Sequence, residues 1–205
     1  MEAAARLKTT RFPVWTLAIC AGTALVYSLP PLAAILIYDR TAIADGELWR
    51  LVTGNLVHYS TGHLGYDLLA FLVAGIIIET NGYRHYPLLC LTAAAGIGMV
   101  LYWGEPAMFY YAGLSGVATA AVVYLCLHGL IEKGAWQWMC VAALLGLGIK
   151  VAIEFTLDEP LLVAGGAKEF LPMPQSHLVG ACVALFLFVL LYLRKRNMPQ
   201  VSQSQ

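Results

Sequence analysis

The feature that most limits the fold of this 205-residue chain is a series of long apolar stretches separated by short polar ones. A helix needs about 20 apolar residues to cross the roughly 30 Å of hydrocarbon in a bilayer. Charged residues make up 12% of the chain, against about 25% in soluble domains. We therefore predict an all-α, polytopic membrane domain over residues 14–196. Its six helical spans are expected at residues 14–38, 63–78, 87–103, 115–131, 136–157 and 176–193.

The first apolar stretch follows a short basic segment and could be mistaken for a signal peptide. It is long enough to cross a bilayer, so we predict an uncleaved span that Pro30-Pro31 bends or breaks. Residues 1–13 are then a cytoplasmic segment. Residues 197–205 are polar and lack an apolar period, which predicts a disordered cytoplasmic tail.

Basic residues are unequally distributed between the two sides that six spans define. Eight fall on the side of the termini: Arg6, Lys8, Arg11, Arg84, Lys133, Arg194, Lys195 and Arg196. Three fall on the other side: Arg40, Arg50 and Lys168. Because basic residues concentrate in cytoplasmic loops, we predict that both termini are cytoplasmic. The net charge of zero gives no indication of a nucleic-acid partner.

Polar residues occur at the outer ends of three predicted spans. The second span begins with His63 and Asp67, the fourth with Ser115, and the sixth with Ser176 and His177. Polar groups inside a membrane are costly and are therefore candidates for function. Three such sets at one depth predict a site in the outer leaflet.

Ser115 and His177 are the candidate nucleophile and base. A lone serine at a helix start is usually a cap, but Gly113 and Gly116 let backbone approach closely and can expose the hydroxyl. The unpaired N–H groups of a helix N-terminus can stabilise an oxyanion. Gly116 and Gly180 would allow the close helix contact that a Ser–His hydrogen bond requires. The alternative is that His177 only makes a structural hydrogen bond between helices.

Two further polar sets leave alternatives open. His63 and Asp67 share a helical face, so His63 could donate to an oxyanion while Asp67 orients it or holds a water. A metal site with His58 is less favoured because the spacing matches no recognised metal motif, and we predict neither metal nor cofactor. Lys150 and Glu154, four residues apart in mid-span, either neutralise each other inside the bundle or offer a polar contact to substrate or water.

The chain resembles the rhomboid intramembrane serine proteases over residues 47–193. Four short motifs carry the resemblance: Trp49-Arg50, His58 with His63, Gly113-Leu114-Ser115-Gly116, and His177-Leu178-Val179-Gly180. GxSG alone is a weak signal, but GxSG opening one span and HxxG opening a later one form a specific combination. The resemblance implies a dyad of Ser115 and His177, with His63 binding the oxyanion.

One position departs from the family pattern, in which an asparagine usually follows the oxyanion-binding histidine by one turn. Here Asp67 stands in its place, and an ionised carboxylate accepts hydrogen bonds but cannot donate them. Asp67 is therefore either protonated or restricted to orienting His63, in which case the oxyanion hole uses His63 and the Ser115 N–H. In the first outer loop, Trp49 and Arg50 are expected to anchor the chain.

The predicted function is peptide hydrolysis within a bacterial inner membrane, through an acyl-enzyme and with the active site towards the periplasm. Water would reach Ser115 through a polar cavity lined by His58, His63 and Ser176. Details such as the paired Lys150 and Glu154 resemble the rhombosortase branch, which implies membrane-anchored substrates with a C-terminal GlyGly-CTERM signal. The alternatives are a catalytically silent scaffold that binds transmembrane helices and, less favoured, a small transporter.

Overall fold

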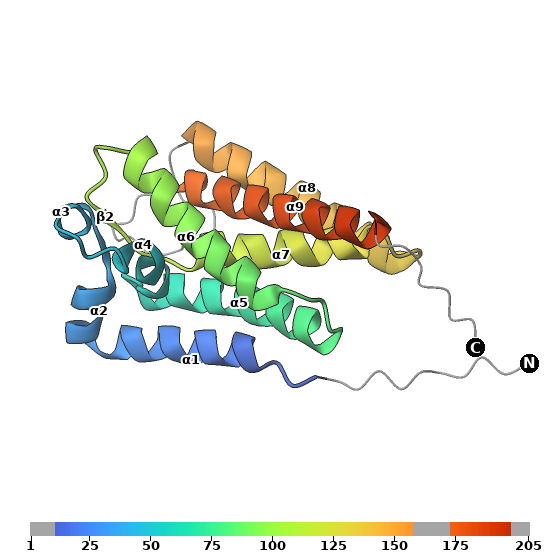
Figure 1. Ribbon diagram of the computed structural model, residues 1–205, viewed down its shortest axis with the longest axis horizontal. Helices are drawn as coiled ribbons and strands as arrows, with labels where there is room; N and C mark the ends of the chain where they lie inside the picture. Colours follow the sequence, from blue (N-terminus) through green and yellow to red (C-terminus); the bar gives the residue numbers. More distant parts are fainter. Residues whose placement is uncertain (1–10, 158–172, 198–205) are drawn as a thin grey trace, which may run out of the picture.

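The computed structural model describes residues 11–157 and 173–197, which form a bundle of helices (Figure 1). The predictions for residues 1–10, 198–205 and Lys168 lie outside these residues. The long helices are α1 (Val14–Ser28), α5 (Thr61–Thr80), α6 (Tyr86–Gly104), α7 (Ser115–Gly129), α8 (Ala135–Leu157) and α9 (Pro174–Asn197).

Helix α7 lies at the centre of the bundle, in contact with α5, α6, α8 and α9. Eleven of its 15 residues are buried, and most of these are small or β-branched, so neighbouring helices can approach it from several sides. In Figure 1, α5, α7 and α9 all begin at the end of the bundle that carries α2–α4. The predicted outer ends of three spans are therefore at one end of the molecule.

Four described helices are long and apolar enough to cross a membrane: α5, α6, α8 and α9. A fifth span requires α1 and α2 (Pro30–Leu36) to be counted together, although they are bent by 113°. The bend falls at Leu29, where the following proline disfavours helical backbone. Helix α7 has 15 residues, or about 22 Å at 1.5 Å per residue, which is short for a span. The sequence predicted six spans, and the helices support four to five by length and composition.

The end of the bundle near Ser115 is built from short elements. These are β1 (Tyr38–Asp39), α3 (Arg40–Ala44), α4 (Arg50–Thr53), the 3₁₀ turn η1 (Gly54–Leu56) and β2 (Tyr110–Tyr111). β1 pairs antiparallel with β2, with Tyr38 opposite Tyr111. The pairing ties the loop that precedes α7 to the loop that follows α2, and the sequence patterns did not predict it.

The predicted close approach of α7 and α9 is present. A Cβ atom added to Gly180 would collide with the carbonyl oxygen of Gly116, and one added to Gly116 would lie 2.8 Å from the carbonyl oxygen of Ser176. The two glycines thus bring the first turn of α7 against the first turn of α9. This contact sets the distance between Ser115 and His177.

Candidate active site

Ser115 is the first residue of α7, directly after a sharp change of backbone direction. Gly113 has φ +139°, a conformation that residues with a side chain rarely adopt. The Tyr111 hydroxyl donates to the Gly113 carbonyl at 3.1 Å. Burial raises the pKa of Tyr111 above its usual range, so the hydroxyl stays protonated and remains a donor. This hydrogen bond therefore holds the backbone turn that leads into Ser115.

Gly113 also has no room for a side chain. An added Cβ would lie 2.8 Å from His63 Cε1 and 3.0 Å from His63 Nε2, well inside van der Waals contact. The His63 ring therefore lies against the backbone that leads into Ser115. This position is suitable for a group that acts on an oxyanion formed next to Ser115.

His63 belongs to a buried network with Asp67 and His58. His63 Nε2 lies 3.2 Å from Asp67 Oδ2, and His58 Nε2 lies 3.0 Å from the same oxygen. The Leu114 N–H lies 3.3 Å from His58 Nε2, which can accept from it only while it does not donate to Asp67. All three side chains are buried, so Asp67 links two imidazoles to the backbone that precedes Ser115.

The same three residues are the described group that could hold a metal ion, because their ligand atoms lie within 4.8 Å of one another. Metal-ligating imidazoles normally donate their second ring N–H to an outer partner. His58 Nδ1 has no hydrogen-bond partner among the described residues, and the three candidate ligand atoms contact one another. The geometry therefore fits a hydrogen-bonded network better than a metal centre.

His177 lies in the first turn of α9 and is buried. The turn is fixed by Ser176, whose hydroxyl donates to the Met173 carbonyl at 2.7 Å. His177 Nδ1 lies 3.1 Å from Glu154 Oε2 on α8. The second oxygen of Glu154 accepts from Lys150 Nζ at 2.7 Å. Lys150 and Glu154 thus pair with each other, which is one of the two alternatives left open by the sequence, and the contact to His177 was not predicted.

A cavity of about 1110 Å³ contains most of these groups. Its lining includes Ser115 and His177 together with His63, Asp67, Lys150, Glu154 and Ser176. His58, which the sequence placed on this wall, is not among the lining residues and lies behind Asp67. Within the described residues, no hydrogen bond joins Ser115 to His177. Such bonds are often loose in enzymes without substrate and tighten on binding.

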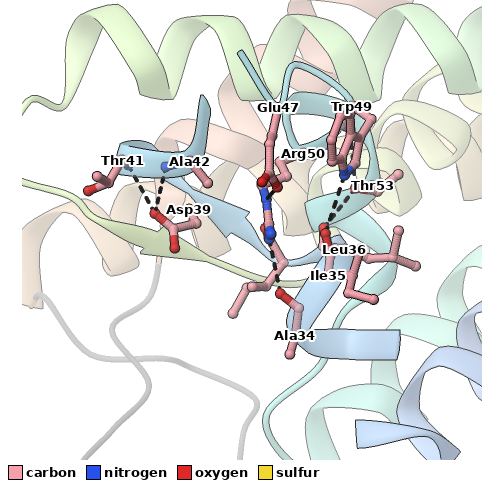
Figure 2. A network of polar contacts seen from close by, with 11 residues as sticks. Ala34, Ile35, Leu36, Asp39, Thr41, Ala42, Glu47, Trp49, Arg50 and Thr53 are labelled. Carbon is pink, nitrogen blue, oxygen red and sulfur yellow. Dashed lines mark hydrogen bonds and ion pairs between the residues drawn. The ribbon is translucent and has the colours of Figure 1, made fainter. Parts of the chain in front are cut away.

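Arg50 and Trp49 lie at the start of α4 and are not among the residues that line the cavity; Figure 2 shows their contacts. The buried Arg50 guanidinium donates from Nη1 to the carbonyls of Ala34 at 3.0 Å and Ile37 at 2.8 Å. Its Nε lies 2.6 Å from Glu47 Oε2. Trp49 donates to the Ile35 carbonyl at 3.3 Å. Because these carbonyls end α2 without helical partners, the two residues fix the loop to α2.

The Rhomboid domain matches the chain over residues 45–194, most of its length. The chain belongs to the rhomboid family. The matched rhomboid domain contains all the polar cavity residues described above, from His63 on α5 to His177 on α9.

Three curated rhomboid relatives are similar to parts of the chain. The rhomboid protease AarA of Providencia stuartii is 30% identical over 57% of this chain and 40% of its own length. The rhomboid protease GlpG of Haemophilus influenzae is 34% identical over 50% of the chain and 56% of its own length. The rhomboid protease GluP of Bacillus subtilis is 27% identical over 58% of the chain and 22% of its own length. The matched part thus spans about half or less of each relative.

Proposed function

We propose that this rhomboid is an intramembrane serine endopeptidase that uses Ser115 as nucleophile and His177 as general base. The main support is the shared cavity: both side chains line it, and the glycine contact of α7 with α9 holds their helix turns together. The rhomboid domain and three relatives named rhomboid proteases support the same class of activity.

In the proposed reaction, Ser115 Oγ bonds to the scissile carbonyl carbon while His177 accepts the hydroxyl proton. Collapse of the tetrahedral intermediate breaks the C–N bond, and His177 returns the proton to the departing amine. Water then attacks the acyl-enzyme with His177 again as base, which releases the acid and restores Ser115. Each step requires one imidazole nitrogen directed at Ser115 and the other held in place.

The developing oxyanion would be stabilised by the first N–H groups of α7 and by His63. The contact of the His63 ring with Gly113 supports this role. The Asp67 carboxylate contacts the imidazoles of both His58 and His63. These contacts favour a role in orienting His63 over direct contact with the oxyanion. A nearby carboxylate would repel an oxyanion unless its charge is balanced by those two rings.

We further propose a six-span topology in which α1 with α2 and the short α7 complete the four long helices. The distribution of basic residues supports cytoplasmic termini. The cavity then opens towards the periplasm of a bacterial inner membrane. A 15-residue α7 agrees with an active serine set below the outer surface, because the loop that precedes α7 must then enter the membrane.

The substrates we propose are membrane-anchored proteins, and the rhombosortase branch suggests those with a C-terminal GlyGly-CTERM signal. The cavity extends along α5, α7 and α8 past largely apolar side chains such as Val73, Leu125 and Leu147. Such a surface suits a substrate span. A glycine pair suits the site itself, since glycine weakens the helix that must unwind to expose its carbonyl.

The test is labelling of the purified full chain in detergent by a fluorophosphonate, together with cleavage of a span that carries a glycine or a leucine pair. We expect wild type to react and Ser115→Ala to be inert. Ser28→Ala is the matched control, because Ser28 is the last residue of α1, does not line the cavity, and donates its hydroxyl to the Ala24 carbonyl. If wild type binds the spans but neither labels nor cleaves, the protein is a catalytically silent scaffold.

A further inference from the structure

Glu154 makes a contact that a Ser–His dyad does not require. Its Oε2 lies 3.1 Å from His177 Nδ1, and both side chains are almost fully buried, at 3% and 8% exposure. The contact does not have the geometry of a hydrogen bond, and neither atom has a hydrogen-bond partner among the described residues. Because buried polar atoms in folded proteins nearly always have a partner, these two unpaired atoms, 3.1 Å apart, are suited to pair with each other after a small rotation of either side chain.

The contact is unusual in where it occurs. Only Cys140 and Glu154 are buried on α8 in the described chain, and the rest of the helix is half-buried or exposed. A carboxylate at this depth is expensive to bury. Glu154 lies on the face of α8 that contacts His177, the candidate base. Its other oxygen lies 2.7 Å from Lys150 Nζ, which neutralises the charge.

The geometry also decides which ring nitrogen is available for chemistry. A hydrogen bond from Nδ1 to the Glu154 carboxylate requires the neutral imidazole to carry its proton on Nδ1, which leaves Nε2 unprotonated. Nε2 can then accept the Ser115 proton, and the carboxylate stabilises the imidazolium that forms. If the proton were on Nε2 instead, His177 could not act as a base towards Ser115.

We infer that Glu154 is a positioning residue for His177, so that the site works as a Ser-His-Glu triad assembled from three helices, α7, α8 and α9. Lys150 orients the Glu154 carboxylate and keeps its second oxygen occupied. This inference rests on the proposed protease function. It adds a third member to the site and makes catalysis depend on the packing of α8 against α9.

The replacement Glu154→Gln tests the inference because it preserves size and packing. Lys150 will attract the amide oxygen, so the amide NH₂ faces His177 Nδ1 and forces the ring proton onto Nε2. In proteases with a Ser-His-Asp triad, the corresponding acid-to-amide change lowers kcat by about 10⁴. Here we expect kcat to fall by about 100-fold or more, with KM within about threefold, because the substrate-binding surface is unchanged.

Glu105→Gln is the matched control. Glu105 accepts from the Gln175 side chain at 3.0 Å, so this variant also removes a carboxylate beside the start of α9 without touching His177. Adding Lys150→Met to Glu154→Gln is the second arm. It frees the amide to rotate and accept from Nδ1, and we expect kcat to recover by about tenfold over the single variant.

The measurements are kcat and KM for span cleavage, the rate of Ser115 labelling by the fluorophosphonate, and the His177 Nδ1–H proton signal in ¹⁵N-histidine-labelled protein. A selective loss of kcat, slower labelling and loss of that signal in Glu154→Gln, with the control at wild-type values, support the inference. If wild type labels and Glu154→Gln labels equally fast, the inference is overturned and the protease stands. If kcat falls equally in Glu154→Gln and in the double variant, the loss is due to altered packing of α8. The proposal that Glu154 acts by setting the tautomer of His177 is then overturned. If wild type itself does not label, both proposals fail.

Discussion

Two histidine–carboxylate pairs flank Ser115, and they are built in different ways. The α5 pair consists of His63 and Asp67, one turn apart on one helix, with Nε2 and Oδ2 separated by 3.2 Å. The α8–α9 pair consists of His177 and Glu154 on two helices, with Nδ1 and Oε2 separated by 3.1 Å. The first pair is set by helix geometry alone, whereas the second exists only when α8 and α9 are packed together.

The two carboxylates also divide their charge differently. Asp67 uses one oxygen for two imidazoles, those of His63 and His58. Glu154 gives one oxygen to Lys150 and the other to His177. The α5 pair is thus a fixed support on the side proposed for the oxyanion. The α8–α9 pair is balanced by the Lys150 ammonium, which suits the side where a proton is proposed to be accepted and returned.

The two pairs are expected to differ most in how far kcat falls when the histidine of each is replaced by alanine. Without His177, Ser115 has no base, and general base catalysis contributes about 10²–10⁴. We therefore expect His177→Ala to lower kcat about 10⁴-fold and to abolish fluorophosphonate labelling within the time of the assay. His63→Ala should lower kcat by about 10²–10³, as expected for one oxyanion donor, with labelling still measurable. If His63→Ala is the more severe variant in both assays, the proposed roles are reversed.

How far each pair could be predicted from the sequence follows from how it is built. The i, i+4 spacing by itself places His63 with Asp67, and Lys150 with Glu154, on common helical faces. The small residues around Ser115 and His177 predicted the contact of Gly116 with Gly180. The contact of Glu154 with His177 was missed because it depends on how α8 is rotated about its axis. A buried pair of charges in an apolar helix was the only signal, and it could not show which oxygen was left for a third group.

The same limit applies around the α5 pair. Asp67 reaches His58 because η1 and the turn at residues 57–60 fold back over the start of α5, which no helical period describes. Pairing of β1 with β2 involves two residues on each side and carries no detectable strand pattern. The bend at Leu29 was expected from Pro30-Pro31, but its angle of 113° depends on contacts such as those of Arg50 with the end of α2.

The variant Gly113→Ala tests whether activity requires His63 of the α5 pair to lie close against the backbone that leads into Ser115. Gly113→Ala puts a methyl group 2.8 Å from His63 Cε1 on a backbone with φ +139°. A displacement of about 1 Å in a catalytic group can cost about 10²-fold in rate, and we expect kcat to fall by that order. The backbone strain adds about 1–3 kcal/mol of destabilisation, measured by thermal unfolding in detergent. Gly146→Ala, on an open face of α8, should leave both values unchanged. Wild-type activity of Gly113→Ala would show that His63 is free to move.

The smallest expected change in kcat is that of Asp67→Asn. Comparing this variant with Glu154→Gln tests most directly whether the two carboxylates have different roles. Asp67→Asn keeps an oxygen for one imidazole, and we expect kcat within about threefold of wild type because His63 is still held by a hydrogen bond. Asp67→Leu leaves both imidazoles without their acceptor and should lower the free energy of unfolding by about 1–3 kcal/mol, with a matching loss of activity. Glu154→Gln is expected to behave in the opposite way, with a large loss of kcat and little change in stability. If Asp67→Asn loses activity as severely as Glu154→Gln, Asp67 contributes its charge to the reaction, and the contrast between a supporting pair and a proton-transfer pair no longer holds.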